Sequence, residues 1–227
     1  HKRDHRWVER EDLVQEGLAW CVARTQQVEQ AFGVVTPWGS RITYSHEGRD
    51  FGGALETAGG IVRALPHLAD VFWVAAGDIF APEFEFSAEA YERFKASTCL
   101  AHIWLVPNPE HNAGGDFGLS ADGLALNLPK SGAVSGQTSR PLPAMDPGTL
   151  PDAAQAPLYT FSTIALYKRA FFEAAWCPIP SGNPEGVKAP LAAMLRAAMD
   201  QGLVSASLYE GLWVDVGTPE RLAQLNA

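Results

Sequence analysis

Two strongly apolar segments place the firmest limit on how this chain can fold. Residues 71–75 (VFWVA) and 100–106 (LAHIWLV) are each followed closely by structure-breaking residues, Gly77 in the first case and Pro107 in the second. Apolar runs of this length are typical of strands that are covered on both faces. Segments with helical spacing lie between the strands, and this alternation predicts an α/β fold with a mostly parallel central sheet.

The other segments extend the same alternation. Further strands are expected at residues 20–23, 41–46, 158–167 and 212–216. Helices are expected at residues 10–18, 28–32, 61–65, 86–95 and 190–201. One more helix is expected to begin at Thr218, where a hydroxyl, a proline and an acidic residue follow one another. Residues 116–119 and 123–126 predict a hairpin.

Length and composition indicate a globular protein. The chain has 227 residues, of which 47% are hydrophobic and 19% are charged. Its net charge of −9 argues against a nucleic-acid partner, because nucleic acids are bound by basic surfaces. The three cysteines form no CxxC or Cys/His cluster, which disfavours a zinc site. No apolar run approaches the roughly 18 residues of a membrane span, so we expect a cytoplasmic protein without a membrane partner.

One long segment interrupts the alternation of strands and helices. Residues 130–157 are rich in Pro, Gly, Ser and Thr and show no apolar period. We expect a single domain over residues 1–227 in which this segment is a surface loop. Loops of this length within a domain are usually functional or mobile. Nothing in the sequence indicates the oligomeric state.

Two aspartates share one sequence context. Asp78 follows the apolar segment 71–75 directly after Gly77, and Asp215 lies in the motif LWVDVGT, two positions before Gly217. In open α/β sheets, ligands bind beyond the carboxyl ends of the strands. The two carboxylates are therefore candidates to meet at one hard cation such as Mg²⁺, which prefers oxygen ligands. The alternative is that both aspartates only cap turns.

Two polar segments are candidates for ligand binding. In LETAGGI, residues 55–61, Gly59 and Gly60 precede a helical segment, and main-chain N–H groups at a helix start can approach a ligand closely. The loop NPEHNAGGDF, residues 108–117, offers amides, a histidine and an aspartate, a set that suits hydroxyl-rich ligands such as sugars. Ordinary surface loops are the alternative in both cases, and we expect His111 to be exposed rather than a metal ligand.

Five motifs occur together in an order that resembles one enzyme family. They are LETAGGIVRALPHL, VFWVAAGDIF, VPNPEHNAGGDFGL, FSTIALY and GLWVDVGTPERL. In this order they resemble the sugar-1-phosphate nucleotidyltransferases, and most of all the bacterial N-acetylmuramate-1-phosphate uridylyltransferases. The resemblance covers residues 41–227 except for 130–157. It implies a Rossmann-like three-layer fold and attack of a sugar-1-phosphate oxygen on the α-phosphorus of a nucleoside triphosphate, with release of pyrophosphate.

The resemblance also implies roles by motif position. Asp78 and Asp215 resemble the catalytic aspartates that bind Mg²⁺. The nucleotide-binding residues that it implies are Glu56, Thr57, Gly59, Gly60 and Gly77. The sugar-binding residues that it implies are Asn108, Asp116, Ser162 and Thr163, although FST stands here in place of the commoner FSG. Such a transfer needs mainly positioning and charge neutralisation, which agrees with the lack of a nucleophile-elbow motif around Ser162.

One departure separates this sequence from the family pattern. The family opens with a strand and a Gly-rich loop whose Arg and Lys hold the triphosphate, and this unit of roughly 30 residues is missing here. We therefore interpret the sequence as a truncated or incomplete form of a longer chain. One alternative is a catalytically inactive protein of the same fold that binds a nucleotide sugar. Another is a metal-dependent glycosyltransferase, which is disfavoured because Asp78 is not part of a D-x-D motif.

Overall fold

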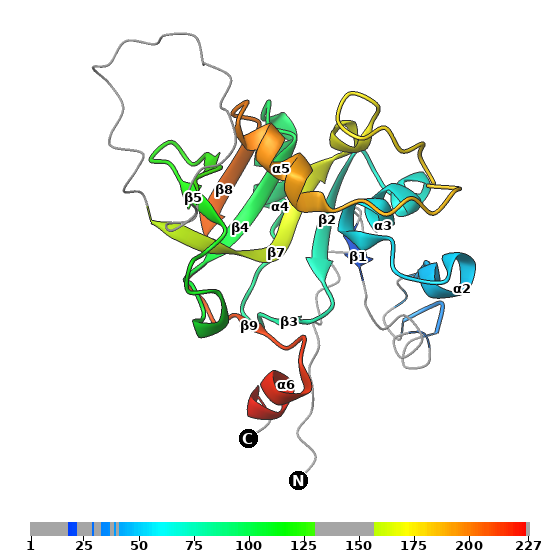
Figure 1. The fold of residues 1–227 in the computed structure, drawn as a ribbon, viewed down its shortest axis with the longest axis horizontal. Coiled ribbons are helices and arrows are strands. Elements are labelled where there is room, and N and C mark those ends of the chain that lie inside the picture. Colours follow the sequence, from blue (N-terminus) through cyan, green and yellow to red (C-terminus); the bar gives the residue numbers. More distant parts are fainter. Residues whose placement is uncertain are drawn as a thin grey trace.

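A mixed sheet forms the centre of the protein, and helices cover both of its faces (Figure 1). The computed structural model describes residues 18–21, 29, 33–36, 39, 41–129 and 157–225. Within them, the sheet runs in the order β1 (Leu18–Cys21), β2 (Val71–Ala76), β7 (Leu158–Lys168), β4 (Ala101–Val106) and β8 (Val204–Leu208). A hairpin extends it through β5, and its strands are β5 (Phe117–Leu119) and β6 (Ala125–Leu126).

The direction of β7 corrects the expectation of a mostly parallel sheet. β1 and β2 are parallel, as are β4 and β8, but β7 runs antiparallel to both of its neighbours, β2 and β4. Both pairs that β5 makes are antiparallel as well. A strand buried on both faces needs apolar residues whichever way it runs, so the composition of residues 158–167 carries no information on direction. The α/β class is confirmed, and the sheet is mixed.

The two faces of the sheet belong to two separate hydrophobic cores. On β2, Phe72 and Val74 join one core, whereas Trp73 and Ala75 join the other. The first core includes residues of helices α3 and α5, and the second includes residues of α4. These helices span Glu56–Ala64 (α3), Leu191–Met199 (α5) and Ala88–Ala96 (α4). Burying one large apolar side chain contributes roughly 1.5–3 kcal/mol, so helix layers on both sides hold the sheet that carries the site.

Local sequence signals explain where the longer helices begin and end. The Ser87 hydroxyl accepts a hydrogen bond from Ala90 N at 3.2 Å and caps α4. Beyond α5, Gly202 adopts φ 68° and Leu203 N donates to Ala198 O at 3.0 Å, which ends the helix as its glycine predicts. The shorter helical segments are α2 (Glu47–Phe51), η2 (Leu65–His67), η3 (Glu110–Asn112) and η5 (Arg169–Phe172).

A second, two-stranded sheet lies beyond the carboxyl end of β2 (Figure 1). Its strands are β3 (Ile79–Phe80) and β9 (Val214–Asp215), which pair antiparallel, and helix α6 (Pro219–Leu225) follows β9. The Thr218 hydroxyl accepts a hydrogen bond from Arg221 N at 3.3 Å, as expected of a residue that caps a helix start. This small sheet connects the end of the chain to the first apolar strand.

The expected elements have mixed outcomes. The strands at residues 71–75, 100–106 and 158–167 are confirmed, as are the hairpin and the helices at 86–95 and 190–201. The strand at residues 41–46 is wrong, because Arg41 makes only an isolated bridge to Val35. Helix α3 begins at Glu56 and so includes the glycines that were expected to precede it.

Some expectations cannot be compared with the structure. The helices expected at residues 10–18 and 28–32 and the loop expected at 130–157 lie outside the described residues, apart from positions 18, 29 and 157. Among the helices that the structure does describe, none is long and apolar enough to cross a membrane.

Candidate functional site

The pairing of β3 with β9 brings Asp78 and Asp215 together. Asp78 ends the turn that follows β2, and the next residue, Ile79, pairs with Asp215 across the small sheet. Val216 N also donates a hydrogen bond to Asp78 O at 2.8 Å. The two carboxylates are far apart in sequence but lie at one place in the fold, beyond the carboxyl end of β2.

Gly217 lies close to both carboxylates. A Cβ atom at this position would lie 3.0 Å from Asp78 Oδ2 and 3.0 Å from Asp215 Oδ1. Gly217 N donates to Asp215 Oδ1 at 2.8 Å, which fixes the orientation of that carboxylate. The two carboxylate oxygens therefore lie close together beside Gly217, and such a pair suits a hard divalent cation.

The donor set around this point is small. Within the described ranges, no group of three or more His, Cys, Asp and Glu side chains is placed to hold a metal ion. Mg²⁺ is commonly held by one or two carboxylates and completes its shell with water and substrate phosphates. A pair of aspartates is therefore compatible with a cation that binds together with a phosphorylated substrate, and less so with one held by the protein alone.

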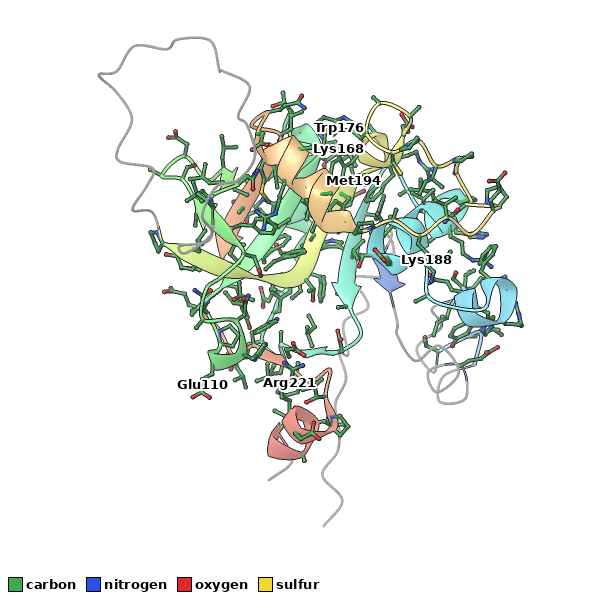
Figure 2. All side chains as sticks on the ribbon, viewed as in Figure 1. Glu110, Lys168, Trp176, Lys188, Met194 and Arg221 are labelled. Carbon is green, nitrogen blue, oxygen red and sulfur yellow. The ribbon has the colours of Figure 1, made fainter. Side chains whose placement is uncertain are left out.

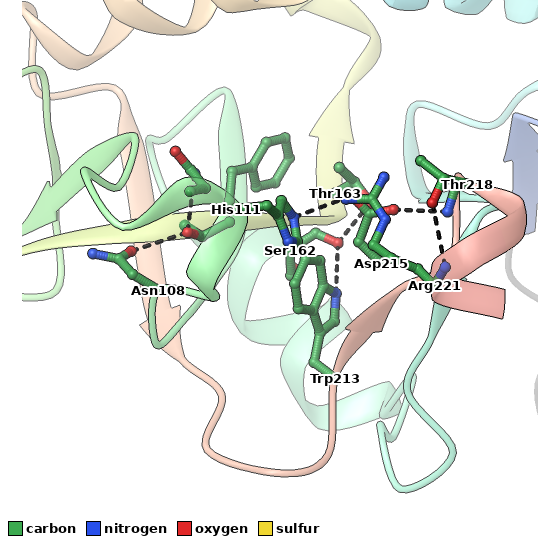
Figure 3. A network of polar contacts seen from close by, with 12 residues as sticks. Asn108, His111, Ser162, Thr163, Trp213, Asp215, Thr218 and Arg221 are labelled. Atoms are coloured by element: carbon green, nitrogen blue, oxygen red, sulfur yellow. Dashed lines mark hydrogen bonds and ion pairs between the residues drawn. The ribbon is translucent and has the colours of Figure 1, made fainter. Parts of the chain in front are cut away.

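Two side chains that the sequence did not place beside the aspartates contact Asp215 (Figure 3). Arg221 Nη1 lies 3.1 Å from Asp215 Oδ2, and His111 Nε2 lies 3.4 Å from the same oxygen. His111 is exposed as expected, with 41% of its side chain accessible, but it faces the site rather than bulk solvent alone. Arg221 could have been noticed as the residue one turn after the Thr218 cap, because such spacing brings a side chain back toward the helix start.

A hydrogen-bonded network ties the polar loop after β4 to β7. Asn112 Nδ2 donates to Asp116 Oδ2 and to Thr160 Oγ1, both at 3.0 Å. Thr160 Oγ1 donates to Asn108 Oδ1 at 2.9 Å, and Phe161 N donates to Asp116 Oδ2 at 3.1 Å. The structure thus brings two of the expected sugar-binding residues, Asn108 and Asp116, into one framework whose amides and carboxylate hold the loop in place.

The other two expected sugar-binding residues lie in an irregular part of β7. The register between β4 and β7 shifts between Ile103 and Leu105, opposite the segment that contains Ser162 and Thr163. Ser162 is fully buried, and its hydroxyl accepts from Ile164 N at 3.1 Å, so its side chain supports the backbone. The Ser162 carbonyl accepts from Trp213 Nε1 at 3.1 Å, which ties this segment to the residue before β9 (Figure 3).

Thr163 has a strained backbone. Its φ is 64°, in the left-handed region that residues with a branched Cβ rarely adopt. Its hydroxyl donates to Ser162 O at 2.6 Å. Conformations of this kind cost roughly 1–3 kcal/mol and persist where the surroundings over-determine them. Glycine adopts this conformation without strain, whereas this chain places a threonine there.

The expected nucleotide-binding residues lie at the start of α3 and in the turn after β2. Glu56, at φ 60°, and Thr57 are exposed, whereas Gly59 and Gly60 are buried. Gly77 is exposed beside Asp78. α3 lies near β1 and β2, while the aspartates lie beyond the end of β2 (Figure 1). The structure thus does not gather all of the expected residues at one point.

The segment before α5 occupies the main-chain donors at the start of α3. Ala58 N and Gly59 N donate to Ala189 O at 3.0 and 3.2 Å. A Cβ on Gly59 would lie 2.6 Å from Val187 O, so the glycine is required by this close approach. Of the first residues of α3, the exposed Glu56 and Thr57 remain accessible to a ligand.

Asn183 holds the same segment against α3. It is fully buried and adopts φ 43°. Its Nδ2 donates to Gly59 O at 3.1 Å and to Val187 O at 2.9 Å, and its Oδ1 accepts from Val187 N at 2.8 Å. Asparagine tolerates the left-handed region better than most residues. The turn therefore supports the position of α3 without belonging to a ligand site itself.

A comparison with curated proteins finds a relative of substantial sequence identity, although no family model matches the chain. The N-acetylmuramate alpha-1-phosphate uridylyltransferase of Neisseria meningitidis serogroup B is 35% identical over 208 residues, which cover 89% of this chain and 73% of that protein.

Solved structures share the fold at much lower identity. HddC from Yersinia pseudotuberculosis has a TM-score of 0.56 at 14% identity, over 91% of this chain and 75% of its own. The inositol-1-phosphate CTP transferase from T. maritima has a TM-score of 0.52 at 11% identity, over 90% of this chain and 70% of its own. These likenesses show the fold, and the 35% identical uridylyltransferase shows that the chain is an enzyme of the sugar-1-phosphate nucleotidyltransferase family.

Proposed function

We propose that this enzyme transfers UMP from UTP to the 1-phosphate of an N-acetylated amino sugar of the N-acetylmuramate type. The choice of base and sugar is supported by the 35% identical relative, whose name specifies both. An oxygen of the sugar-1-phosphate forms a bond to the α-phosphorus of UTP, the bond from that phosphorus to the bridging oxygen breaks, and pyrophosphate leaves. The products are a UDP-sugar and pyrophosphate.

The observation that carries the proposed chemistry is that the carboxylates of Asp78 and Asp215 lie together beside Gly217. Asp78 and Asp215 are the residues that would hold Mg²⁺. When bound there, Mg²⁺ would act as a Lewis acid and as a template for the two phosphorylated substrates. The hydrogen bond from Gly217 N fixes the orientation of Asp215 Oδ1.

A second group of residues is proposed to bind and orient the nucleotide. Glu56 and Thr57, both exposed at the start of α3, are proposed to contact the uracil base and ribose, with Gly59 and Gly60 giving the helix its close fit. Gly77 is proposed to let the nucleotide approach the turn that carries Asp78.

The sugar is proposed to lie over the irregular part of β7. Asn108, Asp116 and Thr163 are the side chains proposed to contact the sugar. Ser162 is proposed to support the backbone of β7 at this place through the hydrogen bond that its hydroxyl accepts from Ile164 N. The network that fixes this loop to β7 suits a ligand rich in hydroxyl groups, because amides and carboxylates pair with hydroxyls in fixed directions.

The test is formation of UDP-sugar and pyrophosphate from UTP and N-acetylmuramate-1-phosphate by the full-length protein. Asp78→Asn and Asp215→Asn are expected to lower kcat by roughly 100-fold or more. Each substitution removes a negative charge that is proposed to hold the cation, and the cation neutralises the phosphates during the transfer. Asp122→Asn is the matched control, since Asp122 is an exposed aspartate in the turn between β5 and β6. Full activity in either site variant would refute the two-aspartate site. Saturable binding of UDP-sugar without any pyrophosphate exchange would refute the proposed transfer.

A further inference from the structure

Arg221 lies at the edge of the space that the two aspartates share. Its Nη1 is 3.1 Å from Asp215 Oδ2, and its Nη2 is 3.6 Å from the point that a Cβ on Gly217 would occupy. Asp78 Oδ2 and Asp215 Oδ1 converge on that same point at 3.0 Å. A permanent positive charge therefore stands next to the two carboxylates that would hold a divalent cation.

The guanidinium of Arg221 is largely shielded from water. Only 26% of its side chain is exposed, and the corresponding fraction for Asp215 is 27%. Figure 2 shows Arg221 at the end of the sheet where Glu110 follows β4, far from Lys168 at the opposite end. The cap at Thr218 fixes the main chain of Arg221 in the first turn of α6.

One donor of this guanidinium has no acceptor. Arg221 Nε is buried and donates to no atom of the described residues. Buried donors are almost always paired, so an unpaired one marks a place where the described residues lack an acceptor. A bound ligand that carries oxygen atoms would supply one to this guanidinium.

The charges of the site identify that group. A divalent cation on Asp78 and Asp215 would repel the guanidinium and compete with it for Asp215 Oδ2. The substrates that accompany the cation carry phosphates, and the planar fork of an arginine matches phosphate oxygens better than a lysine does. Arg221 would thus exchange one anionic partner for another as the site fills.

We propose that Arg221 is a phosphate-binding residue that Asp215 holds in place until the divalent cation and the nucleotide bind. The inference rests on the proposed function, because it takes its ligand from the substrates named there. In the empty site, the ion pair with Asp215 neutralises the carboxylate. In the filled site, the same guanidinium contacts phosphate oxygens of the nucleotide.

The test separates cation binding from nucleotide binding with three variants. Arg221→Gln removes the charge, Arg221→Lys keeps the charge without the fork, and Arg93→Gln removes an exposed arginine of α4 that pairs with Glu89. Mn²⁺ alone is titrated into each protein, and free Mn²⁺ is measured by electron paramagnetic resonance. KM for UTP at saturating Mg²⁺ is measured separately.

We expect Arg221→Gln to bind Mn²⁺ several-fold more tightly than the wild type in the absence of nucleotide, because a competing charge is gone. The same variant is expected to raise KM for UTP by roughly tenfold or more, since charge-assisted hydrogen bonds are lost. Arg221→Lys is expected to keep wild-type Mn²⁺ affinity and still raise KM, and Arg93→Gln is expected to change neither quantity.

Two results would overturn the inference. Weaker Mn²⁺ binding by Arg221→Gln would show that the arginine only orients Asp215, and an unchanged KM for UTP would show that it does not contact the nucleotide. Failure of the proposed function would look different, because the wild type itself would then form no UDP-sugar.

Discussion

Replacing Asn183 is expected to loosen the support of α3 by a predictable amount. Asn183→Ala removes three hydrogen bonds, one to Gly59 O and two to the main chain of Val187. A net hydrogen bond contributes roughly 0.5–1.5 kcal/mol, and we take the lower end for Val187 because that residue is partly exposed. Placing alanine at a left-handed φ costs roughly 1–2 kcal/mol more. The free energy of unfolding should therefore fall by about 3 kcal/mol, which lowers Tm by roughly 6–12 °C in a chain of this size.

The matched variant is Asn183→Asp, which has the same shape but replaces the amide donor with a carboxylate oxygen. That oxygen would face Gly59 O and Val187 O, which lie 3.1 and 2.9 Å from the present Nδ2. Burying an unpaired charge among acceptors is costly, and it raises the pKa of the new carboxyl above its unfolded value. The folded state of this variant binds the proton more tightly, so its stability relative to the wild type should recover as the pH falls.

Urea unfolding followed by circular dichroism measures both effects by linear extrapolation. The reasoning is refuted if Asn183→Ala unfolds within about 1 kcal/mol of the wild type, since the turn then contributes less than its own hydrogen bonds. It is also refuted if Asn183→Asp matches the wild type at neutral pH.

Three further predictions concern single positions. Gly217→Ala should stay folded but raise the Mg²⁺ concentration for half-maximal activity by roughly tenfold, because its Cβ would lie 3.0 Å from both carboxylates. Gly48→Ala is the control, since a Cβ at that position contacts nothing. An unchanged Mg²⁺ requirement in Gly217→Ala would contradict a cation site beside Gly217. Thr163→Gly should raise Tm by a few degrees, because relief of strain at φ 64° exceeds the roughly 0.5–1 kcal/mol entropic cost of glycine. Thr163→Ala keeps the Cβ atom and should show no such gain. Equal Tm values for the two variants would argue against backbone strain at this position. His102 has its pKa lowered from 6.5 to about 4, by burial and then by the charge of Arg93. As the pH falls, the histidine of the unfolded chain is protonated before that of the folded chain, so the free energy of unfolding should decline from about pH 6.5 to about pH 4. Urea unfolding at several pH values should show a smaller decline in His102→Gln than in the wild type. An identical decline in the two proteins would show that another group causes it.

Two central strands could be predicted because each is a strongly apolar run with a structure-breaking residue after it. Residues 71–75 and 100–106 are apolar and bounded by breakers, and the structure places β2 and β4 there. Strand β8 was missed because its sequence, VSASL, carries serines, and the structure shows that Ser205 pairs with His102 Nδ1 at 2.8 Å. A strand whose polar residues are hydrogen-bonded to the neighbouring strand cannot be recognised by counting apolar residues.

Other features depend on distant partners and so cannot be read from a local pattern. Residues 41–46 alternate as a strand does, but only Arg41 forms a bridge, to Val35, and a strand requires a neighbour along its length. The direction of β7 likewise depends on which strands it joins.

The candidate site shows the same division. The motifs that end in Asp78 and Asp215 marked both aspartates as candidates, but the pairing of Ile79 with Asp215 is a property of the fold. Arg221 and His111 lie within motifs of the sequence, but their contacts with Asp215 appear only once the atoms around that residue are known.

The origin of the two carboxylates in β3 and β9 has a consequence for biosynthesis. A ribosome makes the chain from its N-terminus, and the N-terminal parts of proteins generally fold first. Asp78 precedes most of the described strands along the chain, whereas its partner strand β9 follows β8. A nascent chain can therefore assemble most of the large sheet while it still lacks one of the two carboxylates that are proposed to hold the cation. The proposed chemistry requires both, so a chain that has not yet reached β9 consumes no nucleoside triphosphate.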